Sequence, residues 1–566
     1  MSNANSREME ELAALRMELA ATRSALTVAE SKLAGTEDSL FIAQGRLAVT
    51  EHRLVVTQDK LSLAEDRCMA LQAQVERTRE QLALMRRQKY GQKSERHQKE
   101  MDQLELVLDE LEETLAEASA ERAAREREKG ETPRPRRKAI RRPLPEHLPR
   151  EVIELAPTII CACGQCNPDG LVRIGEDVTE VLEKIAAPLK VLRYVRPRLA
   201  CRSCEKIFQA PAPDMPVEKG RASASLIASV IVAKYWDGLP LHRQSSILAR
   251  DGVEIDRSTL ADWIGHGAWW LEPLRDRIQA YVMSRDVLWT DDTPIKVLAP
   301  GHGKTKEARI WCYGHDPATW GSDEPPAMLY CYSADRKGER PRTHLEHYAG
   351  WLHSDAYAGY EKLFGVKEGK SSPIRPVACM AHARRYFFNV YTTQPAPLAE
   401  EAVARIGLLY DIEREIRGLP PDQRLAVRQA RAVPILKDFH TWATAQKARV
   451  SSKYALGKAF NYALKRWDRL CAYTLDGRLS IDNNFSERCL RNIAVTRKNF
   501  LFLGSDRGGE RAAIFYTLLT TATLNGLNPE RWLADVLDRL ARGHPMHQID
   551  DLLPWNWSLQ VKPQAT

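Results

Sequence analysis

The sequence lacks any long uninterrupted run of apolar residues. No stretch reaches the roughly 18 consecutive apolar residues of a membrane-spanning helix, and no apolar segment typical of a signal peptide lies near the start. We therefore expect neither a membrane span nor a secretory signal. Cysteine is also sparse, at 11 in 566 residues. Without an export signal, clustered cysteines more often bind metal than form disulfides, so we expect a reducing compartment.

A strong charge of either sign is missing as well. The net charge of +8 is modest for 566 residues, so the position of the basic residues matters more than their number. Hydrophobic residues make up 44% and charged residues 28%, the balance of a soluble globular protein. A chain of this length exceeds one hydrophobic core, and we therefore expect several domains in a multidomain α+β protein.

Residues 1–125 carry a helical pattern with a leucine-rich seam. Apolar residues recur every seven positions, at Leu12, Leu19, Leu26, Leu33, Leu40, Leu47, Leu54, Leu61, Cys68, Val75 and Leu82. The second seam, three residues later, is mostly Ala and Thr, which predicts a thin coiled coil of modest stability. The pattern breaks at "KYGQKSE" and resumes at Leu104. We interpret this leader as a coiled coil that pairs protomers; the alternative is a solvated helix that packs on its own domain.

Residues 126–150 form a linker in which repeated prolines exclude a helix. Its basic residues are Arg134, Arg136, Arg137, Lys138, Arg141 and Arg142. An extended basic linker can neutralise DNA phosphates. Charge runs are usually just solvated, so this linker alone is weak evidence for nucleic-acid binding.

Residues 151–215 contain two cysteine knuckles. Cys163-x-x-Cys166 and Cys201-x-x-Cys204 can present four thiolates to a tetrahedral Zn²⁺. The 34 residues between them exceed the usual gap, but "EVLEKIAAPLKVLRYVRPRL" can fold back as a hairpin. Four thiolates leave no open coordination position, so we predict a structural zinc. Cys161 is a spare thiol that could replace Cys163.

Residues 216–280 are expected to form a helical domain that binds DNA. The stretch "LHRQSSILARDGVEIDRSTLADWIGHGAWW" predicts a helix, a turn at Asp251–Gly252 and a second helix capped by Asp256 or Ser258. This spacing fits a helix-turn-helix. Many small helical domains share it, so a helical domain without DNA contacts is the alternative.

From Asp286, strand patterns replace the helices. Three successive β candidates are "VLWTDDTPIKVL", "ARIWCYGHD" and "AMLYCYSAD". The helix "RTHLEHYAG", the strands "GWLHSDAYAGY" and "IRPVACMAH" and the helix "ARRYFFNVY" follow. This order predicts an α/β layer with a mixed sheet over residues 281–510. Residues from about 397 to 475 form a helical insertion with no second sheet, and residues 511–566 form a helical tail.

Two adjacent acids lie in the first of these strands, where Asp is disfavoured and an unpaired buried charge is costly. One of Asp291 and Asp292 can converge with Asp355 and Glu487 at an edge of the sheet. Carboxylate oxygens suit Mg²⁺ or Mn²⁺, and two such ions can promote phosphodiester displacement. The alternative is that these acids are N-caps and surface pairs. Successive strand residues point to opposite faces, and periodicity alone does not say which face of the strand meets the other two acids.

The sequence resembles bacterial DDE transposases of the insertion-sequence sixty-six type over nearly the whole chain. The resemblance includes "YGQKSE", "RRPLPEHLPRE", "RIGEDVTE", "TDDTPIKVLAPGHGKTKEARIWCY", "SDAYAGY", "MAHARRYFF", "IDNNFSERCLRNIAVTRKNFLFLGSDRGGERAAIFYTLL" and "DLLPWNW". No single segment is specific, but their combination is. The knuckle "CACGQC" is longer than the family's usual form, which leaves the identity of one zinc ligand open.

The resemblance implies an RNase H-like catalytic core with Asp291, Asp355 and Glu487 as its acidic triad, holding two Mg²⁺ or Mn²⁺ ions. It favours Asp291 over Asp292, which would then pair with a neighbouring base or accept backbone hydrogen bonds. It also implies DNA, further protomers and small accessory proteins of the same element as partners. The expected location is the bacterial cytoplasm, at the nucleoid.

Basic residues near the third acid have plausible supporting roles. Arg488, Arg491, Arg497 and Lys498 follow Glu487 and could hold DNA phosphates. The alternative for them is a solvated helix face. His382 could touch the scissile phosphate or a transferred strand, and its alternative is a hydrogen-bonded packing histidine.

These features predict a transposase that binds the terminal inverted repeats of an insertion sequence, cleaves DNA with metal ions and joins the cut strand to target DNA. One rival is a catalytically silent DNA-binding regulator, which the presence of all three acids argues against. Another is an RNase H-like nuclease that cuts without joining. A purely structural coiled-coil protein is disfavoured because more than 400 residues follow the leader.

Overall fold

The computed structural model describes residues 69–79, 81, 107–118, 144, 146, 149–156, 171–184, 189–202, 206–217, 220–299, 304–364, 373–393, 396–500 and 502–558. The heptads before residue 69, the basic residues of the linker and the cysteines at 161, 163, 166 and 204 lie outside these residues. The chain divides into two compact units. The first unit comprises Met1–Lys234, Leu239–Pro273 and Leu533–Met546, and the second comprises Tyr235–Gly238, Leu274–Trp532 and His547–Thr566.

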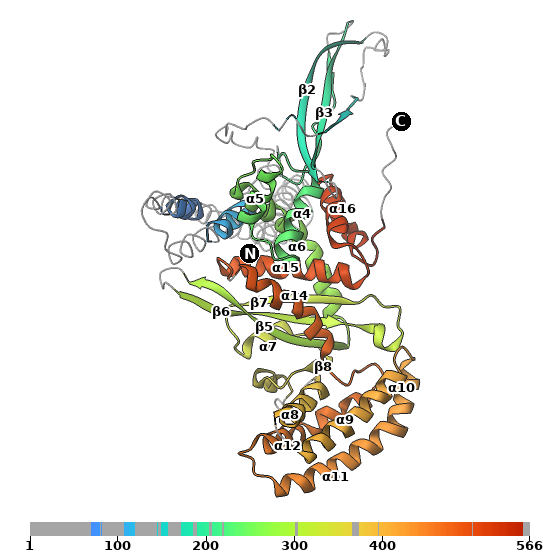
Figure 1. Cartoon of the computed structure of the whole chain (residues 1–566). Coiled ribbons are helices and arrows are strands. Elements are labelled where there is room, and N and C mark those ends of the chain that lie inside the picture. Colours follow the sequence, from blue (N-terminus) through green and yellow to red (C-terminus); the bar gives the residue numbers. More distant parts are fainter. Residues whose placement is uncertain are drawn as a thin grey trace, which may run out of the picture. The chain divides into compact units, whose positions relative to one another are not determined.

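The first unit contains a sheet built around a long hairpin (Figure 1). Its strands are β1 (Arg150–Glu154), β2 (Leu171–Lys184), β3 (Leu189–Cys201) and β4 (Ile207–Gln209). Strands β2 and β3 pair antiparallel along their whole length, from Leu171 opposite Cys201 to Lys184 opposite Leu189. The predicted hairpin between the two knuckles is therefore confirmed. Strand β1 pairs parallel and β4 antiparallel with β3.

Three helices follow in the sequence: α4 (Ala224–Tyr235), α5 (Leu241–Arg250) and α6 (Arg257–Met283). The predicted turn between the last two is confirmed, and Gly252 adopts a φ of 77°, which favours glycine. Six residues separate α5 from α6. This connection is longer than the three or four residues of a compact helix-turn-helix.

Two segments of the leader contact each other within the chain. Val75 of the helical segment 69–79 packs with Leu108 and Leu111 of the helical segment 107–118. Arg79 and Glu112 form an ion pair of 2.8 Å across this contact. For these residues the apolar seam is covered by the same chain, which favours the alternative of a helix that packs on its own domain.

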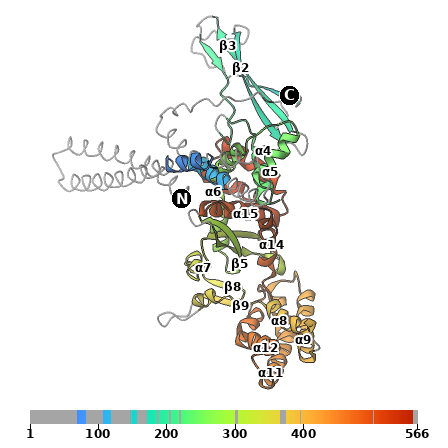
Figure 2. The same cartoon turned by 60° about the vertical axis from the view of Figure 1, so that its left-hand side comes forward.

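The second unit contains a five-stranded mixed sheet in the order β7-β6-β5-β8-β9. Figure 2 labels three of its strands, β5, β8 and β9. The strands are β5 (Val287–Ala299), β6 (Lys304–His315), β7 (Ala327–Ser333), β8 (Gly350–Ser354) and β9 (Ile374–Ala378). Strands β5, β6 and β7 are antiparallel neighbours, whereas β8 and β9 run parallel to β5. The predicted mixed sheet is confirmed. Its antiparallel part is β7-β6-β5, and β8 and β9 extend it on the other side of β5 as parallel strands.

Two predicted boundaries near this sheet are wrong. Residues Met380–His382 belong to helix α8 (Met380–Thr393) rather than to a strand, because the partner strand β8 ends at Ser354, opposite Ala378. Helix α7 (Glu339–His344) begins and ends earlier than predicted, and a 3-10 helix, η3 (Ala358–Leu363), follows β8.

The predicted helical insertion is confirmed. Residues 397–475 contain α9 (Pro397–Glu415), α10 (Pro421–Val427), η4 (Arg428–Ala432), α11 (Val433–Arg449), α12 (Ala455–Lys465), α13 (Trp467–Cys471) and η5 (Ala472–Thr474). The fully buried Arg428 ties this bundle to the strand–helix layer. It pairs with Glu413 at 2.7 Å and donates to the carbonyl of Leu479 at 2.8 Å.

The chain continues through α14 (Asn484–Phe500), α15 (Asp506–Leu524), α16 (Pro529–Ala541) and η6 (Met546–Leu552). Helix α15 crosses the boundary at residue 510 that the sequence suggested between core and tail. Its Thr517 hydroxyl accepts the N–H of Tyr330 in β7 at 2.9 Å, so this helix packs with the five-stranded sheet.

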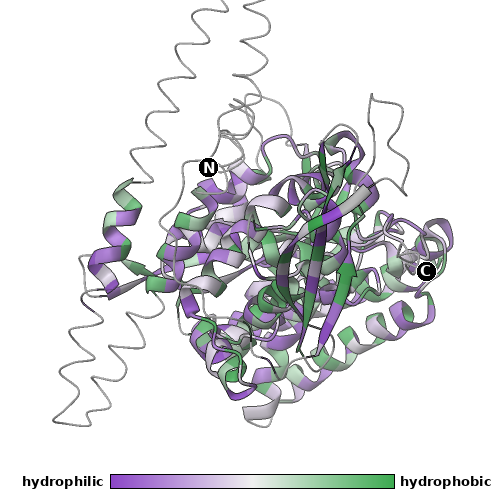
Figure 3. Ribbon diagram, turned by 90° about the horizontal axis from the view of Figure 1, so that it is seen from above, coloured by the Kyte–Doolittle hydropathy of each residue, from purple (hydrophilic) through white to green (hydrophobic). Residues whose placement is uncertain are grey.

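Hydrophilic and hydrophobic residues alternate along many ribbons, as expected where one face of an element is buried (Figure 3). No helix among the described residues is long and apolar enough to cross a membrane.

Candidate active site

The two adjacent acids of β5 point to opposite faces of the sheet. Asp291 shares its face with Trp289, whose ring lies 5.8 Å from the ring of Phe485 in α14. Asp292 lies opposite Trp311, whose ring contacts His344 of α7. Asp291 therefore faces the helix that carries Glu487, and Asp292 faces the other side.

Asp292 is occupied by two guanidinium groups. Its side chain is 1% exposed and pairs with Arg336 at 2.8 Å and with Arg309 at 3.2 Å. Arg336 in turn lies over the ring of Tyr357, 4.1 Å from its centroid. The prediction that Asp292 pairs with a neighbouring base is confirmed. This carboxylate is neutralised by the protein itself.

Asp291 pairs with no cationic side chain among the described residues, and its pKa is raised. Burial first, then the negative charges of Asp355, Asp292 and Glu487, raise the pKa of Asp291 from its ordinary value of 3.8 to about 7. The N–H of Asp292, donated to Asp291 Oδ1 at 2.8 Å, opposes this shift only partly. The charges of Asp355 and Glu487, the other two predicted catalytic acids, thus both act on Asp291.

Asp355 comes directly after β8, where the chain turns toward η3. Its Oδ1 accepts the N–H of Tyr357 at 3.0 Å, a local turn that fixes the carboxylate. The Tyr357 hydroxyl donates to the carbonyl of Arg336. Tyr357, which packs against Arg336, the ion-pair partner of Asp292, therefore also orients Asp355.

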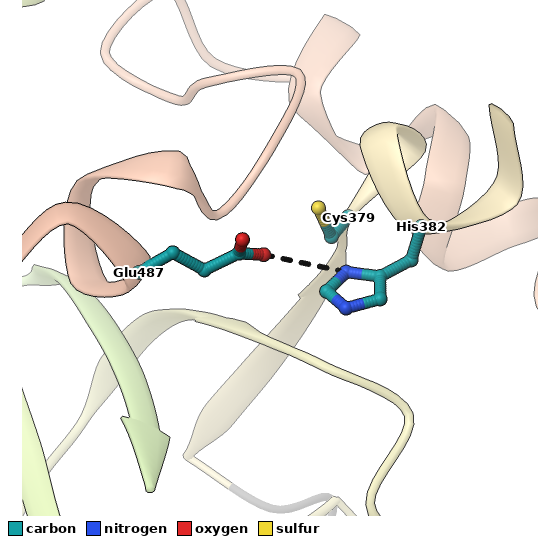
Figure 4. A group of neighbouring side chains, drawn as sticks. All are labelled: Cys379, His382 and Glu487. Carbon is teal, nitrogen blue, oxygen red and sulfur yellow. Dashed lines mark ion pairs between the residues drawn. The ribbon is translucent and has the colours of Figure 1, made fainter. Parts of the chain in front are cut away.

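Glu487 lies in the first turn of α14, where the helix dipole favours a carboxylate. The fully buried Asn483 anchors this helix start, because its amide donates to the carbonyl of Thr290 in β5 at 2.9 Å. Glu487 Oε1 lies 3.7 Å from His382 Nδ1. The dashed line in Figure 4 marks this ion pair. The other oxygen of Glu487 lies 3.6 Å from Arg385.

Asp291 and Glu487 border an open cavity of about 630 Å³, whose lining does not include Asp355. Its lining comprises Asp291, Asp292, Thr293, His382, Arg385, Asn484, Glu487, Arg488, Leu490, Arg491 and Ala494. The lining combines acids that could hold a divalent cation with bases that could hold phosphates.

The basic residues predicted to bind DNA separate into two groups. Arg488 and Arg491 are exposed and line the cavity, and Lys498 is exposed further along α14. Arg497 instead donates to Thr293 Oγ1 at 2.8 Å and so holds α14 against β5. His382 lines the cavity and faces Glu487.

Sequence reasoning missed three residues of this site: Arg336, Asn483 and Cys379. Arg336 reaches Asp292 from 44 positions away, and no local pattern signals that pairing. Cys379 precedes His382 by three positions, a spacing that commonly presents two ligands to one ion and could have been noticed.

The zinc module is described only in part. Cys201 is buried at the end of β3, and its N–H donates to the carbonyl of Lys206 at 3.0 Å. This bond links the end of β3 to the residue that precedes β4. The other predicted ligands lie outside the described residues.

Part of helix α6 is covered by the acidic segment 107–118. Arg257, its first residue, pairs with the buried Asp109 at 2.8 Å. A Cβ at Gly265 would come within 2.4 Å of the carbonyl of Glu113. These contacts occupy surface of the second helix of the predicted helix-turn-helix.

Four family models match this chain. The one described as "Transposase IS66 family" matches residues 219–511, and the "zinc-finger binding domain of transposase IS66" matches 159–205. The "Transposase C of IS166 homeodomain" matches 77–153, and the "IS66 C-terminal element" matches 517–555.

Relatives of similar length come from Sinorhizobium fredii. The chain is 40% identical over 434 residues to the protein named y4hP, which covers 75% of this chain and 78% of that protein. It is 39% identical over 426 residues to y4jD, covering 75% of this chain and 83% of that protein. The match to the catalytic family spans more than half of the chain, and so the chain belongs to the IS66 family of transposases.

Proposed function

We propose that this protein is a DDE transposase that binds the terminal inverted repeats of its element, cuts the DNA strands and joins them to a target. The observation that carries the proposal is the convergence of Asp291, Asp355 and Glu487. They come from β5, the end of β8 and α14, and their charges act together on the pKa of Asp291.

The sheet supports an RNase H-like core. Three antiparallel strands followed by two strands parallel to the first, in the order β7-β6-β5-β8-β9, are the arrangement of that fold. Asp291 lies on β5 and Asp355 directly follows the adjacent strand β8, so this topology brings the first two acids to one region of the sheet. The helical insertion lies between the second and third acids, as the family resemblance implies.

The three carboxylates fit divalent cations. All donors are oxygens, the ligands that Mg²⁺ and Mn²⁺ prefer. The raised pKa of Asp291 indicates a deficit of positive charge, and Glu487 Oε1 has no hydrogen-bond partner among the described residues. Asp291, Asp355 and Glu487 would hold two ions, which when bound activate a water or a 3′-hydroxyl and neutralise the leaving oxygen.

The remaining residues position this chemistry. Arg336 and Arg309 keep Asp292 neutralised, so that Asp291 alone presents a free carboxylate from β5. Arg488 and Arg491 line the cavity and would hold phosphates that flank the scissile bond. Arg385 would serve the same purpose from α8. His382 would approach the scissile phosphate from the same helix.

The other modules would bind DNA and partners. Cys163, Cys166, Cys201 and Cys204 would hold a structural Zn²⁺, with Cys161 as the alternative to Cys163. The basic linker and the helices α5 and α6 would contact the element ends. The leucine heptads before residue 69 would pair protomers. Small accessory proteins would join the complex, and the protein would act at the nucleoid of a bacterial cytoplasm.

Strand cleavage tests the proposal directly. The full chain is incubated with labelled element ends and Mg²⁺, and the cuts are mapped. Asp291→Asn, Asp355→Asn and Glu487→Gln should each lower cleavage by about 1,000-fold or more and leave end binding nearly intact. Glu510→Gln, a surface acid on α15, is the matched control and should cut normally.

The same assay separates the rivals. A silent regulator binds the ends but does not cut in any divalent cation. A nuclease without strand transfer cuts, yet never joins the 3′ end to a target duplex. Either result with active, folded protein contradicts the proposed transposase.

A further inference from the structure

Three donor atoms of different chemistry meet beside the acidic triad. Cys379 Sγ, His382 Nδ1 and a carboxylate oxygen of Glu487 all lie within 4.8 Å of one another (Figure 4). Cys379 comes directly after β9, His382 lies in the first turn of α8, and Glu487 lies in the first turn of α14. Fixed elements therefore deliver all three donors.

Two of these atoms lack other partners. His382 Nδ1 and Glu487 Oε1 are buried, and neither has a hydrogen-bond partner within the described part of the chain. They face each other at 3.7 Å, which is too long for a hydrogen bond. A buried polar atom without a partner is costly, so both atoms favour a cation between them.

The third donor is preorganised as a ligand. Cys379 is 1% exposed, and its sulfur accepts the N–H of Asn483 at 3.2 Å. This hydrogen bond fixes the position of the sulfur, although burial raises the pKa of the Cys379 thiol to about 12. Asn483 also fixes the start of α14, so the same residue sets the positions of Cys379 and Glu487.

We propose that Cys379, His382 and Glu487 form a binding site for a thiophilic divalent cation of the Zn²⁺ class. A thiolate and an imidazole select such ions over Mg²⁺, which prefers oxygen ligands. Bond lengths of about 2.0–2.3 Å place the ligands of a tetrahedral zinc roughly 3.3–3.8 Å apart. The 3.7 Å between His382 Nδ1 and Glu487 Oε1 already matches this spacing, and the Cys379 sulfur lies within 4.8 Å of both other donors.

The proposed zinc site shares Glu487 with the acidic triad, so zinc bound there should affect strand cleavage. A cation held by the thiol and the imidazole would withdraw that carboxylate from Asp291 and Asp355. Zinc would therefore inhibit strand cleavage, and excess Mg²⁺ would relieve the inhibition only weakly. This consequence rests on the proposed transposase function, whereas zinc binding at the site does not.

Zinc uptake by the full chain tests the site without any activity. Protein whose cysteine module is already loaded with zinc is dialysed against free Zn²⁺ in the presence of excess Mg²⁺. The unmodified chain should bind one further zinc. Cys379→Ser and His382→Gln should lose this additional ion, whereas Cys471→Ser, which removes another thiol of the same unit, should keep it.

A second measurement does not depend on how the variants fold. Co²⁺ added to the zinc-loaded unmodified chain should give a thiolate-to-cobalt charge-transfer band in the near ultraviolet. No further zinc and no such band in the unmodified chain would overturn the site, as would uptake that persists in both folded variants.

Activity then tests the consequence. The cleavage rate of element ends with Zn²⁺, divided by the rate without it, should be well below one for the unmodified chain and near one for Cys379→Ser. If no protein cleaves, the transposase proposal fails, while zinc uptake still decides the site. If the unmodified chain binds the additional zinc and still cleaves at its full rate, then the zinc does not withdraw Glu487 from the acidic triad, and this consequence is wrong.

Discussion

The two sheets of this protein differ in how they are stabilised. Every residue of β8 is buried, and no large hydrophobic side chain is exposed in the described residues of β5 to β9. In the first sheet, Val152, Val178 and Ile207 are 61%, 40% and 60% exposed. The catalytic sheet is thus covered by helices on both faces, whereas the hairpin sheet leaves apolar surface in water.

The comparison indicates different sources of stability. Burial of apolar area stabilises the five-stranded sheet by itself, at roughly 25 cal/mol per Å². The hairpin sheet buries less, and its strand β3 ends at Cys201, one of the predicted zinc ligands. We infer that the chemistry resides on a sheet that folds without metal, and that the hairpin sheet depends on its zinc.

The largest expected effect comes from removal of this zinc. Structural zinc contributes about 10 kcal/mol or more of apparent folding free energy to small modules. A zinc-selective chelator, or Cys201→Ser, should therefore expose the amides of β2 and β3 to hydrogen exchange and leave β5 and β6 protected. Exchange is measured by mass spectrometry on the full chain.

Cys471→Ser is the control for loss of a thiol in the insertion. It should leave exchange in both sheets unchanged. Protection of β2 and β3 that survives zinc removal would show that the hairpin sheet is stable alone, and the contrast between the two sheets would disappear.

The second effect concerns pH and Asp291. Its pKa is about 7 in the folded chain against an ordinary value of 3.8, so between these pH values the folded state binds more protons than the unfolded state. Stability then falls as pH rises through this window. In Mg²⁺-free buffer the ionised carboxylate should destabilise the second unit by at most about 4 kcal/mol.

The difference between variants isolates this group. Asp291→Asn should match the unmodified chain in thermal stability near pH 4 and exceed it near pH 8, and added Mg²⁺ should shrink the excess. Glu510→Gln should show no such trend. If the difference in thermal stability between Asp291→Asn and the unmodified chain stays constant across pH, then the pKa of Asp291 is not raised by burial and its acidic neighbours.

Much of the catalytic sheet could be predicted because its strands are apolar runs between turn residues. The run "VLWTDDTPIKVL" predicts β5 well, and the two acids stand out because a strand interior disfavours them. Alternation showed that only one acid could face the other two. The choice of Asp291 needed the family resemblance, since the helix that covers each face is not encoded locally.

Other features depend on distant partners. The pairing of Asp292 with Arg336 requires the turn after β7, and the end of β9 is set by where β8 ends. The link between α15 and β7 depends on hydroxyls that accept backbone N–H groups nearly 190 residues away. The leader was interpreted as a coiled coil that pairs protomers, but a thin apolar seam can also be covered by the same chain, as Val75 is by Leu108 and Leu111.

A smaller effect is expected at Asp292, on the face of β5 turned away from Glu487. Asp292→Asn leaves Arg336 and Arg309 with weaker partners beside a buried amide, which should destabilise the second unit by about 1–3 kcal/mol. Cleavage should fall but remain measurable. Asp335→Asn, a pair with Arg340 nearer the surface, should change stability by less than about 1 kcal/mol. Thermal unfolding measures the loss of stability in both variants. A larger loss for Asp335→Asn than for Asp292→Asn would contradict the buried pairing of Asp292 with Arg336 and Arg309.

The smallest effect is expected from a single phosphate contact at the cavity. Arg491 is exposed one helical turn beyond Glu487, so it can reach DNA while the acids reach the scissile bond. Arg491→Gln should weaken binding of element ends uniformly across sequences and reduce the salt slope of the binding constant by about 0.9.

Arg431→Gln, an exposed arginine that pairs with Glu415 in the insertion, is the control and should leave the slope unchanged. Binding is measured by fluorescence anisotropy at several salt concentrations in Ca²⁺, to avoid cleavage. An unchanged slope for Arg491→Gln would remove α14 from the DNA-binding surface and leave end recognition to the unit that contains the hairpin sheet.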